Sequence, residues 1–288
     1  MQADCPDCRG TGWSTRTVDG TRRAERCGCW RVGVAEQMLA RARIPARYAR
    51  CDFSTFITYD NEKLQRAFRK AAEFAAAFPV VDKGLLFIGP PGIGKTHLAV
   101  SVLREVVLKG MRGVYYDTRS LLSAIRSTYN PVTRASEADV LAEVMHAELL
   151  VLDDLGAERL TDWVEETMHL VVNSRYNEKR PTVFTTNYED VSEEGDLDSL
   201  LARVRPRLLS RLREMCEFLE YDGPDYREFD HPPTAESLSQ KRRIQPGLRA
   251  GLSAPRAERL PQRTSARARA RIPEGQLDLG WAGGKAGT

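Results

Sequence analysis

A short glycine-rich segment between a predicted strand and a predicted helix restricts the folds open to this chain more than any other feature. The apolar run 84–88 (GLLFI) predicts a buried strand, and the segment 95–109 predicts an amphipathic helix. Between them, residues 89–96 read GPPGIGKT, the pattern G-x-x-x-x-G-K-T. A chance match in a glycine-rich turn is the competing interpretation. Because strand, loop and helix follow in the required order, the pattern predicts a phosphate-binding loop at a helix N-terminus.

The residue types in this loop suit a nucleoside triphosphate and its magnesium ion. Gly92 and Gly94 let backbone N–H groups wrap the phosphates, and Lys95 reaches the β- and γ-phosphate oxygens. The hydroxyl of Thr96 is a ligand for Mg²⁺. The residues predicted to bind ATP in this segment are Gly89, Pro90, Pro91, Gly92, Ile93, Gly94, Lys95, Thr96 and His97.

Two further predicted strands are followed by polar residues suited to phosphate chemistry. After the apolar residues 149–152 come Asp153, expected to hold Mg²⁺ through water, and Asp154, expected to polarise the attacking water as a general base. Asn187 follows the run 182–186. Because the carboxyl ends of parallel strands share one edge of a sheet, we expect Asn187 to reach the γ-phosphate or its water. Taken alone, an asparagine after a strand is usually a turn residue.

Strand-like runs alternate with amphipathic segments through most of the chain. The runs are 84–88, 113–117, 148–152, 182–186 and 217–221. This alternation predicts an α/β fold in which a parallel sheet has helices on both faces. The predicted organisation is a cysteine-rich module at 1–30, a helical linker at 31–51, an ATPase domain at 52–231 and a disordered basic tail at 232–288.

Five motifs follow one another in the chain: GPPGIGKTHLA, LLVLDDLGAE, TDWVEETMHLVVNSRYNEKRPTVFTTN, RLLSRLREM and DYR. In this order they resemble the AAA+ ATPases of the DnaC/DnaI helicase-loader and IstB transposition-helper group, over about residues 50–228. The resemblance implies a P-loop AAA+ fold whose helical lid domain is reduced or absent. It also implies an ATPase that binds Mg²⁺ and assembles with copies of itself through the ATP site.

The same resemblance assigns roles to single residues. It implies a sensor-1 role for Asn187, an inter-subunit arginine finger at Arg211 with Arg207 as second choice, and a sensor-2-like arginine at Arg227. Each arginine, taken alone, also fits an exposed helix face. Asp154 stands where most AAA+ proteins have Glu, and its shorter side chain lies farther from the attacking water. We therefore expect slow or partner-stimulated turnover.

Four of the six cysteines lie in the first 30 residues: Cys5, Cys8, Cys27 and Cys29. Two close pairs separated by a loop suit a tetrahedral Zn²⁺ site. The segment has too few aliphatic residues for a core of its own, so zinc binding would supply its folding free energy. Free or redox-active thiols are the alternative. The resemblance to DnaI-type loaders implies a zinc module that docks on the helicase, and the module's acidic residues argue against nucleic acid as its partner.

Residues 232–288 carry 11 basic and four acidic side chains and only nine large apolar residues among 57, which predicts disorder and an anionic partner. Within this tail, residues 276–281 (Gln276 to Trp281, QLDLGW) resemble the peptide by which bacterial replication proteins dock into the sliding clamp. A chance occurrence of such a short peptide is the competing interpretation.

These features together predict an ATP-dependent loader of a replicative DNA helicase, which binds single-stranded DNA and hydrolyses ATP to release. Two alternatives stay open: an IstB-like transposition helper, which would not need the zinc module, and a nucleotide-gated adaptor without productive turnover. No apolar run approaches the roughly 18 residues of a spanning helix, and the N-terminus lacks a signal-peptide layout. We therefore expect a cytoplasmic protein without membrane contact.

Overall fold

Five parallel strands form one sheet in the order β4-β5-β6-β3-β7. The structure is a computed structural model that describes residues 5–18, 21–128, 137–190, 199–229 and 232–244. The strands are β3 (Gly84–Ile88), β4 (Gly113–Asp117), β5 (Leu149–Asp153), β6 (Thr182–Thr186) and β7 (Cys216–Glu220). The strands predicted from the apolar runs are thus confirmed to within one residue at each end.

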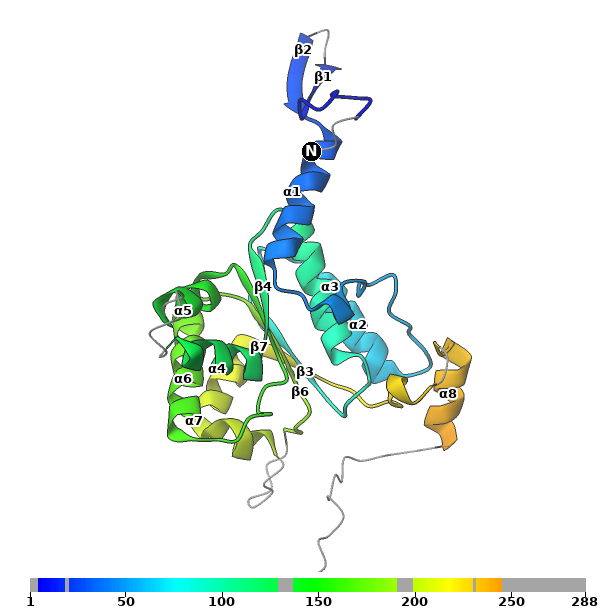
Figure 1. Ribbon diagram of the computed structural model, residues 1–288. Coiled ribbons are helices and arrows are strands. Elements are labelled where there is room, and N and C mark those ends of the chain that lie inside the picture. The colour runs from blue at the N-terminus through cyan, green and yellow to red at the C-terminus, as the bar shows by residue number, and fades with distance from the viewer. Residues whose placement is uncertain (1–4, 19–20, 129–136, 191–198, 230–231, 245–288) are drawn as a thin grey trace, which may run out of the picture. The chain divides into compact units, whose positions relative to one another are not determined.

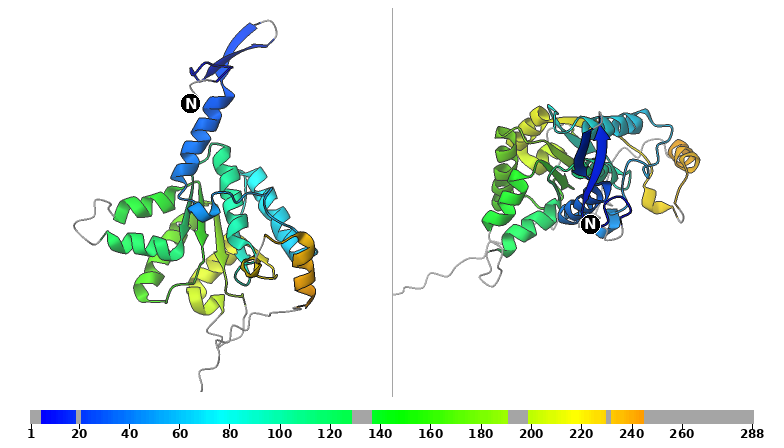
Figure 2. Two further views of the ribbon diagram at one scale, coloured as in Figure 1. Left: turned by 45° about the vertical axis from the view of Figure 1, so that its right-hand side comes forward. Right: turned by 90° about the horizontal axis from the view of Figure 1, so that it is seen from above.

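Helices cover both faces of this sheet, which confirms the predicted fold class (Figure 1). The views in Figure 2 show the same two helical layers. One layer contains α2 (Glu62–Ala77) and α3 (Lys95–Leu108). The other contains α4 (Thr118–Ser127), α5 (Glu137–His146), α6 (Asp162–Asn177) and α7 (Leu200–Met215). None of the helices within the described ranges has the length and apolar composition needed to cross a bilayer.

Because helices cover both faces of the sheet, its strands do not show the alternation of apolar and polar residues that is typical of a half-exposed strand. In β3, Leu85 and Phe87 pack into the core that contains α2 and α3, whereas Leu86 and Ile88 pack into the core on the opposite face. All five residues of β3 are buried. A strand covered on both faces gains burial at every position, which produces the unbroken apolar run seen in the sequence.

The N-terminal residues form a hairpin followed by a helix. Strands β1 (Trp13–Val18) and β2 (Thr21–Arg26) pair antiparallel, and α1 (Gly28–Arg41) begins immediately afterwards. The helix therefore includes Cys29 and crosses the module boundary predicted at residue 30. At its other end, Met38 and Leu39 pack against the core of the α2–α3 layer.

A helix also forms where the sequence predicted only a disordered tail. Helix α8 (Ala235–Ile244) buries Leu238, which is 3% exposed, in the core that contains α2 and α3. Its basic residues form ion pairs, among them Lys241 with Glu228 at 2.8 Å and Arg242 with Asp222 at 3.4 Å. Composition does not predict this helix because, among its described side chains, one buried leucine and a few ion pairs hold it. The remainder of the predicted tail lies outside the described residues.

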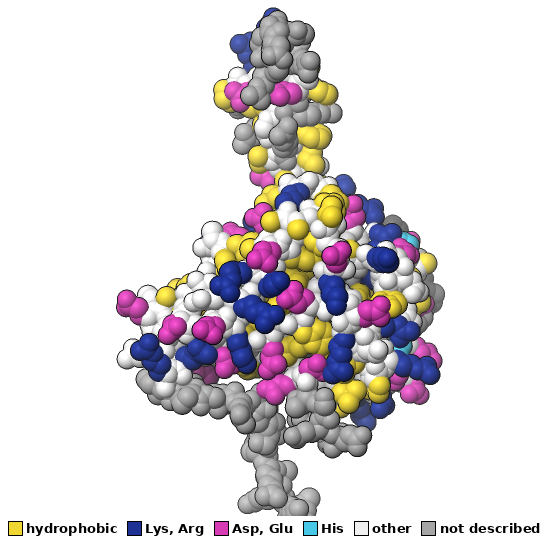
Figure 3. Space-filling model, turned by 180° about the vertical axis from the view of Figure 1, so that it is seen from behind, with side chains coloured by type: hydrophobic (Ala, Val, Ile, Leu, Met, Phe, Trp, Pro, Cys, Tyr) yellow, Lys and Arg dark blue, Asp and Glu magenta, His cyan; other side chains and the backbone are white. Residues whose placement is uncertain are grey.

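The surface of the body mixes charges of both signs. Residues 1–231 carry a net charge of −4, against +3 for the whole chain. On the face seen in Figure 3, Lys and Arg side chains alternate with Asp and Glu side chains around apolar ones. This face therefore carries no field of one sign that would by itself bind a polyanion.

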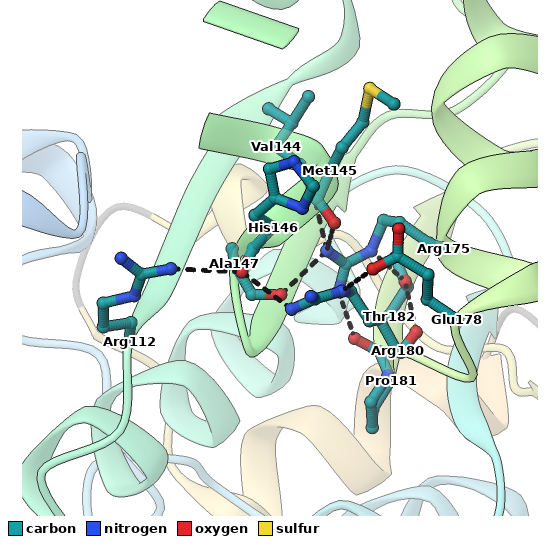
Figure 4. A network of polar contacts seen from close by, with 10 residues as sticks. All are labelled: Arg112, Val144, Met145, His146, Ala147, Arg175, Glu178, Arg180, Pro181 and Thr182. Carbon is teal, nitrogen blue, oxygen red and sulfur yellow. Dashed lines mark hydrogen bonds and ion pairs between the residues drawn. The ribbon is translucent and has the colours of Figure 1, made fainter. Parts of the chain in front are cut away.

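One end of the sheet is fixed by a buried arginine (Figure 4). Arg175 on α6 is 1% exposed and donates hydrogen bonds to Thr182 Oγ1 at 2.7 Å and to the carbonyl oxygens of Val144, Ala147 and Pro181 at 2.8, 2.9 and 2.6 Å. Burial lowers the pKa of this guanidinium to about 9, so it is still charged at neutral pH. The cation lies at the C-terminal end of α5, where the carbonyl groups of a helix favour positive charge. Arg175 thus joins α5, α6 and the starts of β5 and β6.

Replacing Arg175 by Ala should lower the free energy of unfolding by about 3–5 kcal/mol, because several buried carbonyl groups lose their donor. Urea denaturation followed by circular dichroism measures the change. Arg112→Ala is the matched control, since the exposed Arg112 donates to the His146 carbonyl at 3.2 Å in the same network. It should cost less than about 1 kcal/mol. Equal losses for the two variants would contradict the role given to Arg175.

Candidate nucleotide site and cysteine cluster

The predicted phosphate loop and the two polar strand ends meet at one edge of the sheet. A cavity of about 790 Å³ lies there, and its wall includes Lys95, Asp153, Asp154 and Asn187. The loop follows β3, Asp153 ends β5 and is followed by Asp154, and Asn187 follows β6. The parallel sheet brings these residues together because the carboxyl ends of its strands lie on one side.

The loop has the backbone conformation that its glycines permit. Gly92 and Gly94 have φ angles of 79° and 98°, which favour glycine over other residues. A Cβ atom at Gly94 would lie 2.7 Å from the ring of Phe56, and one at Gly92 would lie 1.7 Å from Asp225 Oδ1. The side chains of Phe56 and Asp225 therefore pack directly on the loop.

Lys95 is nearly buried and turns toward the loop that precedes it. Its Nζ donates hydrogen bonds to the carbonyl oxygens of Gly89 and Pro90, both at 2.7 Å. Burial lowers the pKa of this ammonium to about 8, and the nearby Asp153 and Asp154 oppose that shift. The charge of Lys95 is thus held inside the loop that would surround the phosphates.

Asp153 accepts hydrogen bonds from three hydroxyl groups. The donors are Thr96 at 2.9 and 3.1 Å, Thr185 at 2.6 Å and Tyr115 at 2.7 Å. The Asp153 side chain is buried. Burial and the adjacent carboxylate raise the pKa of Tyr115, so its hydroxyl stays protonated and donates. A carboxylate next to the Thr96 hydroxyl has the oxygen ligands that Mg²⁺ prefers, so Thr96 and Asp153 fit the predicted magnesium site.

Asp154 is held by the neighbouring strand β6. Its backbone has a φ angle of 58°, and its N–H donates to Thr185 Oγ1 at 2.9 Å. Its carboxylate accepts a hydrogen bond from Asn187 Nδ2 at 2.7 Å. Burial, and then the charge of Asp153, raise the pKa of Asp154. A carboxylate of raised basicity that borders the cavity is suited to accept a proton from water.

His97 and the predicted arginines occupy different places. His97 lines the cavity, but its Nε2 lies 2.9 Å from the Asp52 carbonyl oxygen, and its ring packs edge-on against Phe56. It therefore holds the segment that contains Asp52 and Phe56 against the loop.

Of the three predicted arginines, Arg227 lines the cavity. Arg207 and Arg211 lie on α7 outside the described cavity wall, one helical turn apart, and Arg211 Nη1 donates to the Arg207 carbonyl oxygen at 3.3 Å.

The four N-terminal cysteines form a compact cluster. Their sulfur atoms all lie within 4.8 Å of one another, with Cys5 and Cys27 at 3.7 Å and Cys8 and Cys29 at 3.2 Å. None of the four forms a disulfide bond. A zinc ion with Zn–S bonds of about 2.3 Å needs sulfur atoms about 3.8 Å apart, so the arrangement is compatible with Zn²⁺. The hairpin and the start of α1 bring the two pairs together.

Comparisons with known proteins agree with this geometry. The sequence profile of the family described as IstB-like ATP binding protein matches residues 35–231. The chain belongs to this family. It is 25% identical over 173 residues to the replicative helicase loader DnaC of Escherichia coli K12. The aligned region covers 60% of this chain and 67% of that protein. The motif resemblance is thus confirmed, and membership identifies the chain as an AAA+ ATPase.

Solved structures give the same result. A crystal structure of the DnaC helicase loader superimposes with a TM-score of 0.54 at 34% identity, covering 61% of this chain and 99% of that one. A crystal structure of DnaI has a TM-score of 0.51 at 22% identity, with 64% of this chain and 94% of that one covered, and shows likeness of fold alone. Helix α8 begins at residue 235, beyond the range matched by the family profile.

Sequence reasoning missed much of the cavity wall. Tyr59, Leu64 and Leu238 also line the cavity, and the Tyr115 hydroxyl contacts Asp153 itself. The Tyr226 N–H also donates to the Gly92 carbonyl oxygen at 3.0 Å, so the DYR motif touches the loop through a residue to which no role was given. These residues come from separate segments of the chain, and no local pattern marks them as neighbours of the loop.

Substitutions at Lys95 and Asp154 should separate ATP binding from hydrolysis. Lys95→Ala should abolish binding, because it removes the cation beside the phosphates. Asp154→Asn should bind ATP normally but hydrolyse it at least about 100-fold more slowly, because an amide is a poor proton acceptor. A fluorescent ATP analogue and a phosphate-release assay provide the measurements. Asp190→Asn is the control, because Asp190 pairs with Arg213 at 2.7 Å outside the cavity wall. Normal hydrolysis by Asp154→Asn would remove Asp154 from this role.

Proposed function

We propose that this ATPase loads a replicative DNA helicase onto single-stranded DNA. The names of the DnaC relatives support a loader. The observation that carries the choice is the cluster of four cysteines, because it offers a separate N-terminal module for docking on a helicase. The second candidate, an IstB-like transposition helper, is favoured by the family profile but does not need such a module.

In this proposal, ATP and Mg²⁺ bind at Lys95, Thr96 and Asp153, and Arg211 acts on the γ-phosphate held by a neighbouring copy of the chain. Binding of ATP thereby assembles protomers, which hold single-stranded DNA and the helicase. Asp154, oriented by Asn187, activates the water for hydrolysis, and loss of the γ-phosphate releases the loader. Arg227 senses the nucleotide from within the same chain. A steady-state ATPase assay with and without single-stranded DNA separates this cycle from a nucleotide-gated adaptor without turnover.

The cysteine cluster is proposed to bind one Zn²⁺ and to dock on the helicase. Cys5→Ser/Cys8→Ser should remove zinc from elemental analysis and abolish capture of the cognate replicative helicase in a pull-down, while ATP binding is preserved. Cys51→Ser is the matched control, since Cys51 lies outside the cluster. Unchanged capture by the zinc-free variant would contradict the docking role. Capture of a transposase in place of the helicase would favour the second candidate.

The arginine finger can be tested by mixing two inactive variants. Arg211→Ala should bind ATP normally but lose DNA-stimulated hydrolysis about 1000-fold or more. If the finger acts on the neighbouring copy, an equal mixture of Arg211→Ala and Asp154→Asn should recover roughly a quarter of the activity, because some interfaces pair an intact site with an intact finger. No recovery by the mixture would contradict action on the neighbouring copy. Normal DNA-stimulated hydrolysis by Arg211→Ala, with loss of hydrolysis in Arg207→Ala, would assign the finger to Arg207.

The predicted clamp-binding peptide at Gln276–Trp281 lies outside the described residues. Its docking into a sliding clamp stays a prediction based on the sequence alone. It adds a second partner to the proposed loader but is independent of the ATP site.

A further inference from the structure

Strand β4 lies at one edge of the sheet, and the chain that follows α1 pairs with that edge. The backbone N–H of Tyr115 donates a hydrogen bond to the carbonyl oxygen of Ala42 at 2.8 Å. Ala42 is the C-cap residue of α1 and is fully buried. The end of α1 is thus hydrogen-bonded to the sheet at a defined residue of β4.

The side chain of this same residue reaches the nucleotide site. The Tyr115 hydroxyl donates to Asp153 Oδ2 at 2.7 Å, and its ring is 4% exposed. Only one residue therefore separates the end of α1 from the carboxylate of Asp153. Because the ring is packed on all sides, a shift of the Tyr115 backbone moves the hydroxyl as well.

The next residue of β4 strengthens this connection on the opposite face of the sheet. The Tyr116 hydroxyl donates to Glu143 Oε2 at 2.6 Å, and Glu143 Oε1 accepts a hydrogen bond from Arg43 Nε at 2.9 Å. The Arg43 guanidinium also lies 5.0 Å from the centre of the Tyr116 ring. Ala42 is therefore attached to the backbone of Tyr115, and Arg43 is attached to the side chain of Tyr116.

We propose that Tyr115 is a positioning residue for Asp153 and that it couples the position of α1 to Mg²⁺ binding at the ATP site. The inference rests on the proposed role of Asp153 as a magnesium-binding residue. The hydroxyl holds Asp153 Oδ2, whose other contact, with Thr96, is longer at 3.1 Å, and so keeps the carboxylate aligned with Thr96. Because Cys29 lies in α1, a partner that moves the cysteine cluster shifts Ala42, Tyr115 and then Asp153.

The test measures binding of a fluorescent ATP analogue by the full chain over a range of Mg²⁺ concentrations. Tyr115→Phe removes one hydroxyl group and keeps the ring. It should raise the Mg²⁺ concentration for half-maximal tight binding about tenfold, as expected for the loss of a hydrogen bond to a charged group, and leave binding without Mg²⁺ unchanged. Tyr116→Phe is the matched comparison. It removes the same atom from the adjacent residue, where the bond is to Glu143, and should raise the Mg²⁺ requirement no more than about two- to threefold, because this residue makes no contact with Asp153.

The link to α1 is tested by a double-mutant cycle. Arg43→Ala loosens the segment after α1 and should raise the Mg²⁺ requirement about two- to threefold in the wild-type background, but not in the Tyr115→Phe background, because both act through one path. An unchanged Mg²⁺ requirement in Tyr115→Phe would overturn the positioning role. Equal effects of Arg43→Ala in both backgrounds would overturn the coupling. The assay contains no helicase, so either failure leaves the proposed loader function standing, and failed helicase capture leaves this inference standing.

Discussion

The hydrogen bonds that converge on the Asp153 carboxylate connect the parts of this protein that have to act together. Thr96 belongs to the helix that follows the phosphate loop, Thr185 to β6 and Tyr115 to the edge strand β4. A buried carboxylate needs such donors, because each oxygen that leaves water must be compensated by a hydrogen bond. The positions of the phosphate loop, of strands β4 and β6 and of the end of α1 therefore all depend on the side chain of Asp153. The backbone of the next residue is fixed in the same way, since Asp154 donates to Thr185.

The two ends of the sheet have opposite roles and different chemistry. At the carboxyl ends, acidic and hydroxyl side chains surround the cavity, so the local field favours a cation together with the phosphates it neutralises. At the amino ends of β5 and β6, the buried Arg175 donates hydrogen bonds to carbonyl oxygens and to Thr182. The buried cation there is structural. It ties α5 and α6 to the sheet and so holds Glu143 of α5 where it contacts Tyr116.

The sequence predicted those features that arise from local pattern. Strands buried on both faces are unbroken apolar runs, and the phosphate loop is a contiguous motif, so both could be read directly. The contact of Tyr115 with Asp153 joins residues 38 positions apart, and Leu238 reaches the cavity from beyond the predicted domain end. Their residue types are ordinary for a strand and for a helix. Only the three-dimensional packing of the segments gives these residues a place beside the nucleotide.

Helix α8, which contributes Leu238 to the cavity wall, is held by much weaker interactions than those that fix Asp153. Among the described side chains of α8, Leu238 is the buried apolar one, and its burial is worth about 2 kcal/mol. Its ion pairs, such as Lys241 with Glu228, involve exposed partners and contribute less than about 1 kcal/mol each. Salt screens such pairs, whereas the buried hydroxyl bonds at Asp153 are little affected. Among the described contacts of the cavity wall, the hydrogen bonds at Asp153 are thus the stronger restraint and those of α8 the weaker one.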